Sequence, residues 1–222
     1  MYTMIRGCVF DAFGTLFRIV LPQELASHSL AQEILLLCRQ KQLEYSWIYG
    51  LMDTYMPFEQ LTQMALEFAF DKLKINDILL MQKLQGSFFT PQYYDDVPEV
   101  LTHLNTQKIA KVILSNGSSK MLSKVLAHTA ITDQFDKVLS AEAAQTFKPN
   151  KTVYQLATKA LRFPKDEILF VSSNQWDIAG AANYGFQTAW VNRDKLLAEP
   201  IIKGKVHYEF ESLKSLMELK LM

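Results

Sequence analysis

The chain has 222 residues, of which 49% are hydrophobic, so it is long enough for one sizeable core or for a core domain with a smaller insertion. Lysine and arginine together number 23, as do aspartate and glutamate, so the formal net charge is zero and no basic surface argues for a nucleic-acid partner. Residues 1–6 lack the features of a signal peptide, and no run approaches the roughly 18 apolar residues of a membrane span, so we expect a cytoplasmic protein without a membrane partner.

The first predicted strand covers residues 8–10 and ends in Asp11, which is followed by a turn that contains Gly14. Open α/β sheets bind their ligands at this C-terminal edge of the strands. Asp11 is therefore a candidate nucleophile. The alternative is an aspartate that only caps the next loop.

Apolar side chains then recur at helical spacing, which predicts a helical insertion after the first strand. We expect one long helix over residues 24–52, a second helix opened by Pro57, and a third over residues 76–85 that Gly86 ends. Residues 18–95 are assigned to a helical cap domain, and residues 1–17 with 96–222 to a core domain. A helical lid over the edge of the sheet can exclude water and supply residues that the core lacks.

Strands and helices alternate in the rest of the chain. The predicted strands end in polar residues and cover residues 111–114, 138–140 and 168–171, and the helices between and after them cover residues 98–107, 119–130, 151–161 and 178–184. This alternation favours an α/β fold with a doubly wound, Rossmann-like parallel sheet covered by helices on both faces. Residues 210–221 predict a last amphipathic helix.

In five motifs the sequence resembles the haloacid dehalogenase superfamily, and within it the L-2-haloacid dehalogenases, also called type II haloacid dehalogenases. The motifs are D-A-F-G-T-L-F at 11–17, R-Q-K-Q-L-E-Y at 39–45, L-S-N-G at 114–117, Lys148-Pro149 with Tyr154, and V-S-S-N-Q-W-D at 171–177. The second and fifth motifs are the discriminating ones. The resemblance implies a Rossmann-like core with an inserted cap, and a homodimer formed through the cap helices.

Phe13 decides between two reactions of this superfamily. Its phosphatases have a second aspartate at this position, which protonates the leaving alcohol. A phenyl ring cannot transfer a proton, whereas a halide leaves without one. The sequence therefore favours hydrolytic removal of halide from short L-2-haloacids, with inversion to 2-hydroxy acids and without a metal or other cofactor. The alternatives are a Mg²⁺-dependent phosphatase and a binding protein without turnover.

By resemblance, the substrates are a small 2-haloacid and water, and eight residues hold the haloacid. Ser115 and backbone N–H groups after Asp11 are expected to bind its carboxylate, while Arg39 receives the halide. The full set is Ala12, Phe13, Arg39, Leu43, Phe58, Ser115, Asn116 and Trp176, in which Asn116 and Phe58 assist Arg39 and Leu43 and Trp176 form apolar walls.

The resemblance also implies a catalytic set around Asp11, which attacks the α-carbon and forms an ester. Lys148 keeps Asp11 ionised, because a nearby cation favours the anion, and Asp177 prepares the water that cleaves the ester. The full set is Asp11, Thr15, Arg39, Ser115, Lys148, Tyr154, Ser172, Asn174 and Asp177, in which Thr15 and Tyr154 orient the cluster and Ser172 and Asn174, with Ser173, fix Asp177 and the water.

Several of these residues have simpler interpretations. An arginine on an amphipathic helix, such as Arg39, is usually a surface residue. Asp177 is also suited to cap the helix that follows it. Two positions depart from the family: Arg18 stands where Asp is common, and Cys38 stands where a larger side chain is expected. Both departures concern the shape of the pocket entrance. Two cysteines make neither a disulfide framework nor a metal cluster, so Cys8 and Cys38 are expected to be free, buried thiols.

Overall fold

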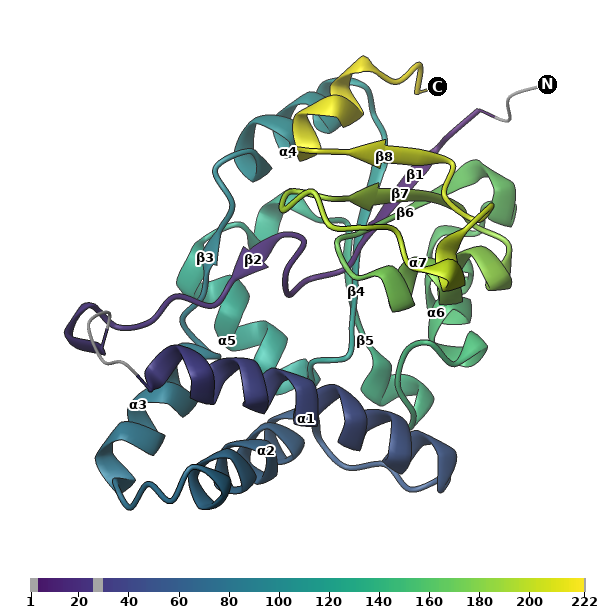
Figure 1. Cartoon of the computed structure of the whole chain (residues 1–222). Coiled ribbons are helices and arrows are strands. Elements are labelled where there is room, and N and C mark those ends of the chain that lie inside the picture. Colours follow the sequence, from purple (N-terminus) through teal and green to yellow (C-terminus); the bar gives the residue numbers. More distant parts are fainter. Residues whose placement is uncertain (1–3, 26–29, 222) are drawn as a thin grey trace.

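The computed structural model describes residues 4–25 and 30–221, which contain a six-stranded parallel sheet (Figure 1). The strand order is β5 (Lys137–Ser140), β4 (Ala110–Ser115), β1 (Gly7–Phe10), β6 (Ile168–Ser172), β7 (Gln187–Val191) and β8 (Tyr208–Phe210). The order reverses at β1, so the crevice that binds ligands is expected at the carboxyl end of this strand. The predicted doubly wound α/β fold is confirmed.

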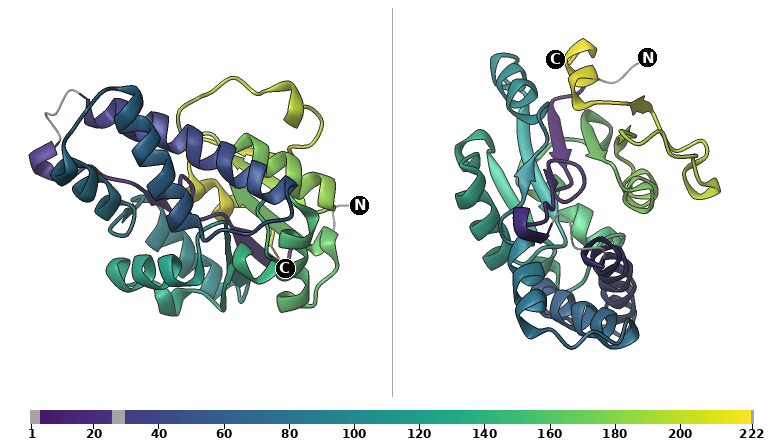
Figure 2. Two further views of the ribbon diagram at one scale, coloured as in Figure 1. Left: turned by 90° about the horizontal axis from the view of Figure 1, so that it is seen from below. Right: turned by 60° about the vertical axis from the view of Figure 1, so that its left-hand side comes forward.

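Helices cover both faces of the sheet because successive strand residues point to opposite sides. Phe10 of β1 packs in the cluster that contains α4 (Val97–Thr106) and α5 (Ser119–Thr129). Its neighbour Val9 packs in the cluster that contains α6 (Lys151–Leu161). The right-hand view of Figure 2 shows the two helical layers on either side of the sheet.

Three helices lie together on the carboxyl side of the sheet (Figure 1): α1 (Ala31–Leu51), α2 (Phe58–Lys72) and α3 (Ile78–Ser87). The chain leaves the core through β2 (Phe17–Arg18) and returns through β3 (Gln92–Tyr93), and these two strands pair antiparallel. The two crossings are thereby held side by side. The predicted boundaries of the cap domain, residues 18 and 95, lie close to this ribbon of β2 and β3, and they stay a prediction.

A stripe of residues four positions apart packs α1 against α2. Its members Cys38 and Gln42 are wholly or almost wholly buried, and both contact Thr62 of α2. Cys38 and Cys8 are free, buried thiols as predicted, and burial raises the pKa of each to about 12. The small Cys38 side chain suits the close approach of the two helices.

Helix boundaries differ from the prediction at two places in the cap. The first predicted helix was expected from residue 24, but α1 begins at Ala31 and a separate 3₁₀ turn covers Gln23–Leu25. Residues 26–29 of that prediction lie outside the described residues. The helix α3 starts two residues later than predicted, because the side chain of Asp77 accepts a hydrogen bond from the Leu80 backbone, and it continues past Gly86 to Ser87.

The predicted C-terminal helix over residues 210–221 is wrong. Phe210 ends the edge strand β8, and its carbonyl accepts a hydrogen bond from the Asn192 backbone at 2.7 Å. A 3₁₀ helix follows at Leu213–Glu218, which buries Leu213 and Leu216 on one side. A spacing of three residues fits both kinds of helix, so the apolar pattern alone did not distinguish them.

The helix after β6 begins earlier than predicted, since α7 covers Gln175–Tyr184. Trp176 and Asp177 therefore stand on its first turn, next to the end of β1. None of the described helices is both long enough and apolar enough to cross a membrane.

Candidate active site

Asp11 lies at the carboxyl end of β1 and is almost fully buried. Its backbone N–H donates to the carbonyl of Val171 in β6, which fixes its place at the switch point of the sheet. One carboxylate oxygen, Oδ1, accepts a hydrogen bond from Lys148 Nζ at 2.7 Å. The other, Oδ2, accepts from Asn174 Nδ2 at 2.8 Å and from Thr15 Oγ1 at 3.3 Å. The carboxylate is thus held in one orientation.

The ammonium group of Lys148 is wholly buried between two carboxylates. Besides Asp11, it donates to Asp177 Oδ2 at 2.5 Å and to the Leu114 carbonyl at 3.0 Å. Burial lowers the pKa of Lys148, but the negative charges of Asp11 and Asp177 outweigh burial and raise this pKa above its ordinary value. Lys148 is therefore a cation at neutral pH.

Asp177 has no exposed surface, and Tyr154 donates its hydroxyl proton to Asp177 Oδ1 at 2.7 Å. Burial raises the pKa of Asp177 from 3.8 to about 6, the charge of Lys148 opposes this rise, and the charge of Asp11 adds to it. The carboxylate bonds Lys148 and Tyr154 rather than the start of α7. The simpler interpretation of Asp177 as a helix cap is therefore wrong.

The loop after β6 connects the two carboxylates. Ser172 Oγ lies 3.5 Å from Asp11 Oδ2 and 3.4 Å from Asp177 Oδ2. The next residue, Ser173, donates its backbone N–H to Thr15 Oγ1 at 2.8 Å, and Thr15 in turn donates to Asp11. Asn174 completes the loop and donates to Asp11. The predicted catalytic residues on this loop therefore all contact the carboxylates directly or through one partner.

Nine residues line a small cavity beside Asp11, with a volume of about 10 Å³. All nine belong to the predicted set: Asp11, Phe13, Arg39, Leu43, Phe58, Ser115, Asn116, Lys148 and Trp176. The cap supplies Arg39 and Leu43 from one face of α1 and Phe58 from the start of α2. The remaining predicted binding residue, Ala12, is buried in the core outside this lining.

Two side chains in the cavity offer N–H groups to an anion. The Nδ2 group of Asn116 is buried and has no hydrogen-bond partner among the described residues, while its Oδ1 accepts from the Lys148 backbone at 2.8 Å. Arg39 is half-buried and lines the cavity, so it is not the solvated surface residue of the simpler interpretation. Burial lowers the pKa of Arg39, whereas the charge of Asp11 raises it. The cavity thus combines a nucleophilic carboxylate with donors for an anion.

Sequence reasoning missed two residues that hold this site. Gln42 accepts a hydrogen bond from Arg39 Nη1 at 2.7 Å, and it stands inside the R-Q-K-Q-L-E-Y motif. Arg193 donates to the Thr15 carbonyl at 3.1 Å and to Ser173 Oγ at 3.3 Å. Arg193 follows β7, so its position at the carboxyl end of a parallel strand was a signal for it.

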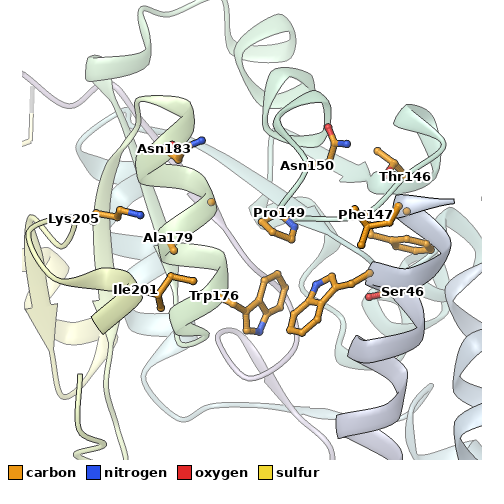
Figure 3. Close-up of a pocket in the computed structure, with 14 residues that line it drawn as sticks. Ser46, Thr146, Phe147, Pro149, Asn150, Trp176, Ala179, Asn183, Ile201 and Lys205 are labelled. Carbon is orange, nitrogen blue, oxygen red and sulfur yellow. The ribbon is translucent and has the colours of Figure 1, made fainter. Parts of the chain in front are cut away.

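Two larger hollows adjoin this cavity. One, of about 580 Å³, lies between α7, which carries Trp176 and Ala179, and α1, which carries Ser46 (Figure 3). Trp176 lines both spaces, and its ring meets that of Trp47 edge to face with 5.7 Å between centroids. The other hollow, of about 850 Å³, shares Phe13 and Arg39 with the cavity and has Arg18 on its wall.

No three His, Cys, Asp or Glu side chains of residues 4–25 and 30–221 gather in a way that could hold a metal ion. Between Asp11 and Asp177, the two carboxylates at the site, lies the Lys148 ammonium.

Comparisons with known proteins agree on one family. Residues 5–185 match the haloacid dehalogenase-like hydrolases. The (S)-2-haloacid dehalogenase of Pseudomonas sp. strain YL is 37% identical over 219 residues, which cover 97% of this chain and 94% of the relative.

Two solved structures share the fold over almost the whole chain. A dehalogenase with an intermediate complex has a TM-score of 0.94 and 34% identity, with 100% of both chains covered. The L-2-haloacid dehalogenase of Xanthobacter autotrophicus with chloropropionic acid covalently bound has a TM-score of 0.85 and 31% identity, and the match covers 97% of this chain and 98% of that one.

Proposed function

Because the chain belongs to the haloacid dehalogenase-like hydrolase family, we propose that it is an (S)-2-haloacid dehalogenase that converts short L-2-haloacids to 2-hydroxy acids. The observation that carries the proposal is the Asp11 carboxylate, bonded to Lys148 and facing a cavity that holds Arg39 and the unpartnered amide of Asn116. Asp11 can act as the nucleophile, and Arg39 and Asn116 can bind the halide that leaves.

In the first step a carboxylate oxygen of Asp11 attacks the α-carbon of the haloacid. A carbon–oxygen bond forms, the carbon–halogen bond breaks with its electron pair, and the configuration at carbon inverts. The N–H groups of Arg39 and Asn116 donate hydrogen bonds to the departing halide, and Phe58 lines the same space. Ser115 and the backbone after Asp11 hold the substrate carboxylate. Thr15 and Asn174 keep the Asp11 carboxylate aligned.

In the second step water attacks the carbonyl carbon of the Asp11 ester, and Asp177 accepts its proton. The raised pKa of Asp177, about 6, suits a general base that works near neutral pH. The bond between the carbonyl carbon and the ester oxygen then breaks, and this oxygen takes up the proton that Asp177 accepted. Asp11 is restored, and the 2-hydroxy acid leaves with the configuration that the first step produced. The Xanthobacter autotrophicus relative, which holds chloropropionic acid covalently, supports an ester intermediate here.

The chain supports this function better than phosphate-ester hydrolysis. Phe13 lines the cavity where a phosphatase needs an acid for the leaving alcohol. The ammonium of Lys148 also lies between Asp11 and Asp177, so these carboxylates already have a cation. Turnover is therefore proposed to need no added metal.

One experiment tests the function: halide release from the L and D forms of 2-chloropropionate, with and without EDTA. We expect release from the L form only, with D-lactate as the product and no effect of EDTA. L-lactate or a racemate would refute inversion. Stronger turnover of phosphate esters than of haloacids, restored by Mg²⁺, would favour the phosphatase, and the absence of any turnover would favour a binding protein.

The proposal extends to the assembly and the cellular location. We expect a homodimer formed through the cap helices and a cytoplasmic enzyme. Light scattering on a gel-filtration column measures the first property.

A further inference from the structure

A buried amide joins Arg39 to the second helix of the cap. Gln42 is 1% exposed, and its Oε1 accepts the hydrogen bond from Arg39 Nη1 at 2.7 Å. Its Nε2 donates to Thr62 Oγ1 at 2.5 Å, and Thr62 donates its hydroxyl proton to the Phe58 carbonyl at 2.8 Å. The relay therefore begins at a guanidinium that lines the cavity and ends at Phe58, another residue of the cavity wall.

The relay fixes which way the amide points. Because the Thr62 hydroxyl donates its hydrogen bond to the Phe58 carbonyl, its oxygen can only accept the hydrogen bond from Gln42. The nitrogen of the amide must then face Thr62 and its oxygen must face Arg39. The orientation of Gln42 thus follows from the partners on α2.

A neutral partner matters at this position. Burial disfavours the charge of Arg39, and the nearby acidic groups that favour it include Asp11 and Asp177. A glutamate in place of Gln42 would form a charge-assisted pair and cancel the positive charge that an anion seeks. An amide satisfies the same donor and leaves the charge available.

We propose that Gln42 is a positioning residue that holds the Arg39 guanidinium against the cavity as an uncancelled cation, so that it can receive the departing halide. This inference rests on the proposed dehalogenation. It adds a role for Gln42, Thr62 and the contact between α1 and α2 in the first step of the reaction.

The test is the variant Gln42→Glu, which keeps the size of the side chain and adds a carboxylate. Halide release in a single turnover should slow by about tenfold or more, the equivalent of a charge-assisted hydrogen bond, while hydrolysis of the ester keeps its rate. No ester should accumulate. The matched control is Gln40→Glu, the same change at an exposed position of the same helix, and it should stay within about twofold of the parent.

A binding measurement separates this inference from the proposed function. Bromide should bind the free protein about tenfold or more weakly in Gln42→Glu than in Gln40→Glu, followed by isothermal titration. The variant Thr62→Val, which removes the hydroxyl that accepts from the Gln42 amide and donates to the Phe58 carbonyl, should weaken bromide binding in the same direction, and it provides the test if Gln42→Glu does not fold. Equal bromide affinity in the folded variants, or equal slowing of both half-reactions, would overturn the role of Gln42. A parent protein that binds bromide but releases none from haloacids would instead refute the proposed function.

Discussion

Lys148 serves two carboxylates at once, so its removal tests the electrostatics of the site. In Lys148→Met, Asp11 and Asp177 face each other without the cation, which should cost about 3–5 kcal/mol of unfolding free energy at pH 8. The charge of Lys148 lowers the pKa of Asp177, so without this cation the pKa of Asp177 rises further above its ordinary value. The folded state then gains stability at low pH and loses it as the pH rises through the pKa of Asp177.

Urea unfolding at pH 5 and pH 8 measures this effect. The loss in Lys148→Met should be clearly smaller at pH 5, where Asp177 holds a proton. The control Lys151→Met changes an exposed lysine at the start of α6 and should shift stability by no more than about 0.5 kcal/mol. An equal loss at both pH values would contradict the coupling between the two carboxylates.

Asp177 and Asp11 are expected to act in different steps, and Asp177→Asn should separate them. The amide keeps the shape of the side chain but cannot accept the proton of water, so the Asp11 ester should accumulate. Mass spectrometry after mixing with L-2-chloropropionate should find the added fragment on the peptide that contains Asp11. Normal turnover would remove Asp177 from the mechanism, and an inactive, unlabelled variant would assign it to the attack step.

Among the elements, the ribbon of β2 and β3 is held in place by Arg193, which lies in the loop after β7. The guanidinium of Arg193 donates to the Thr15 carbonyl before β2 and to both carboxylate oxygens of Asp96 after β3, at 3.1 and 3.3 Å. It also stacks 3.9 Å above the ring of Tyr94. Asp96 in turn accepts from Ser212 Oγ and from the Leu213 backbone. Arg193 thus connects both crossings between core and cap.

We expect Arg193→Gln to lower the unfolding free energy by about 2–4 kcal/mol, because the buried Asp96 carboxylate loses its cation. Halide release should also slow, since Thr15 and Ser173 lose a partner. Thermal unfolding and the halide assay measure the two effects. Lys195→Gln, in the same loop but exposed and paired with Glu211, is the control and should change neither. A variant as stable as the control would show that the ribbon holds without Arg193.

The elements that sequence predicts well are those with two independent signals. The strands that end in Asp11, Ser115 and Ser172 combine an apolar run with a polar end, and parallel pairing brings these ends together. The predicted C-terminal helix rested on apolar spacing alone, and pairing of β8 with β7 overrode it. Gln42 is one polar residue among several on α1, and its role depends on a contact with α2 that no local pattern encodes.

For the whole molecule, a net charge of zero means that an anionic substrate is attracted only by local charges. Arg18 and Arg39 both line the hollow of about 850 Å³ beside the cavity, and Arg18 is half-exposed with a loose ion pair of 3.7 Å to Asp95. The departure of Arg18 from the family's usual aspartate therefore adds a cation to one approach to the site.

Replacement of Arg18 by the family's residue, Arg18→Asp, should lower kcat/KM for L-2-chloropropionate by about two- to fivefold at low salt, with kcat unchanged. The difference should shrink at 0.5 M salt, because the Debye length is then only about 4 Å. The control Lys159→Glu reverses an exposed charge near the end of α6 and should have no such effect. A loss that persists at high salt would assign Arg18 a structural role.

The cavity beside Asp11 has room for about one water molecule, far less than any haloacid requires. Because this space is so small, we expect the cap to move away from the core when substrate enters and again when product leaves. A closed cap would shield the ester from bulk solvent and limit the water that reaches it. An acid too long for the closed space would hold the cap open, so we expect closure of the cap to contribute to the discrimination between substrates.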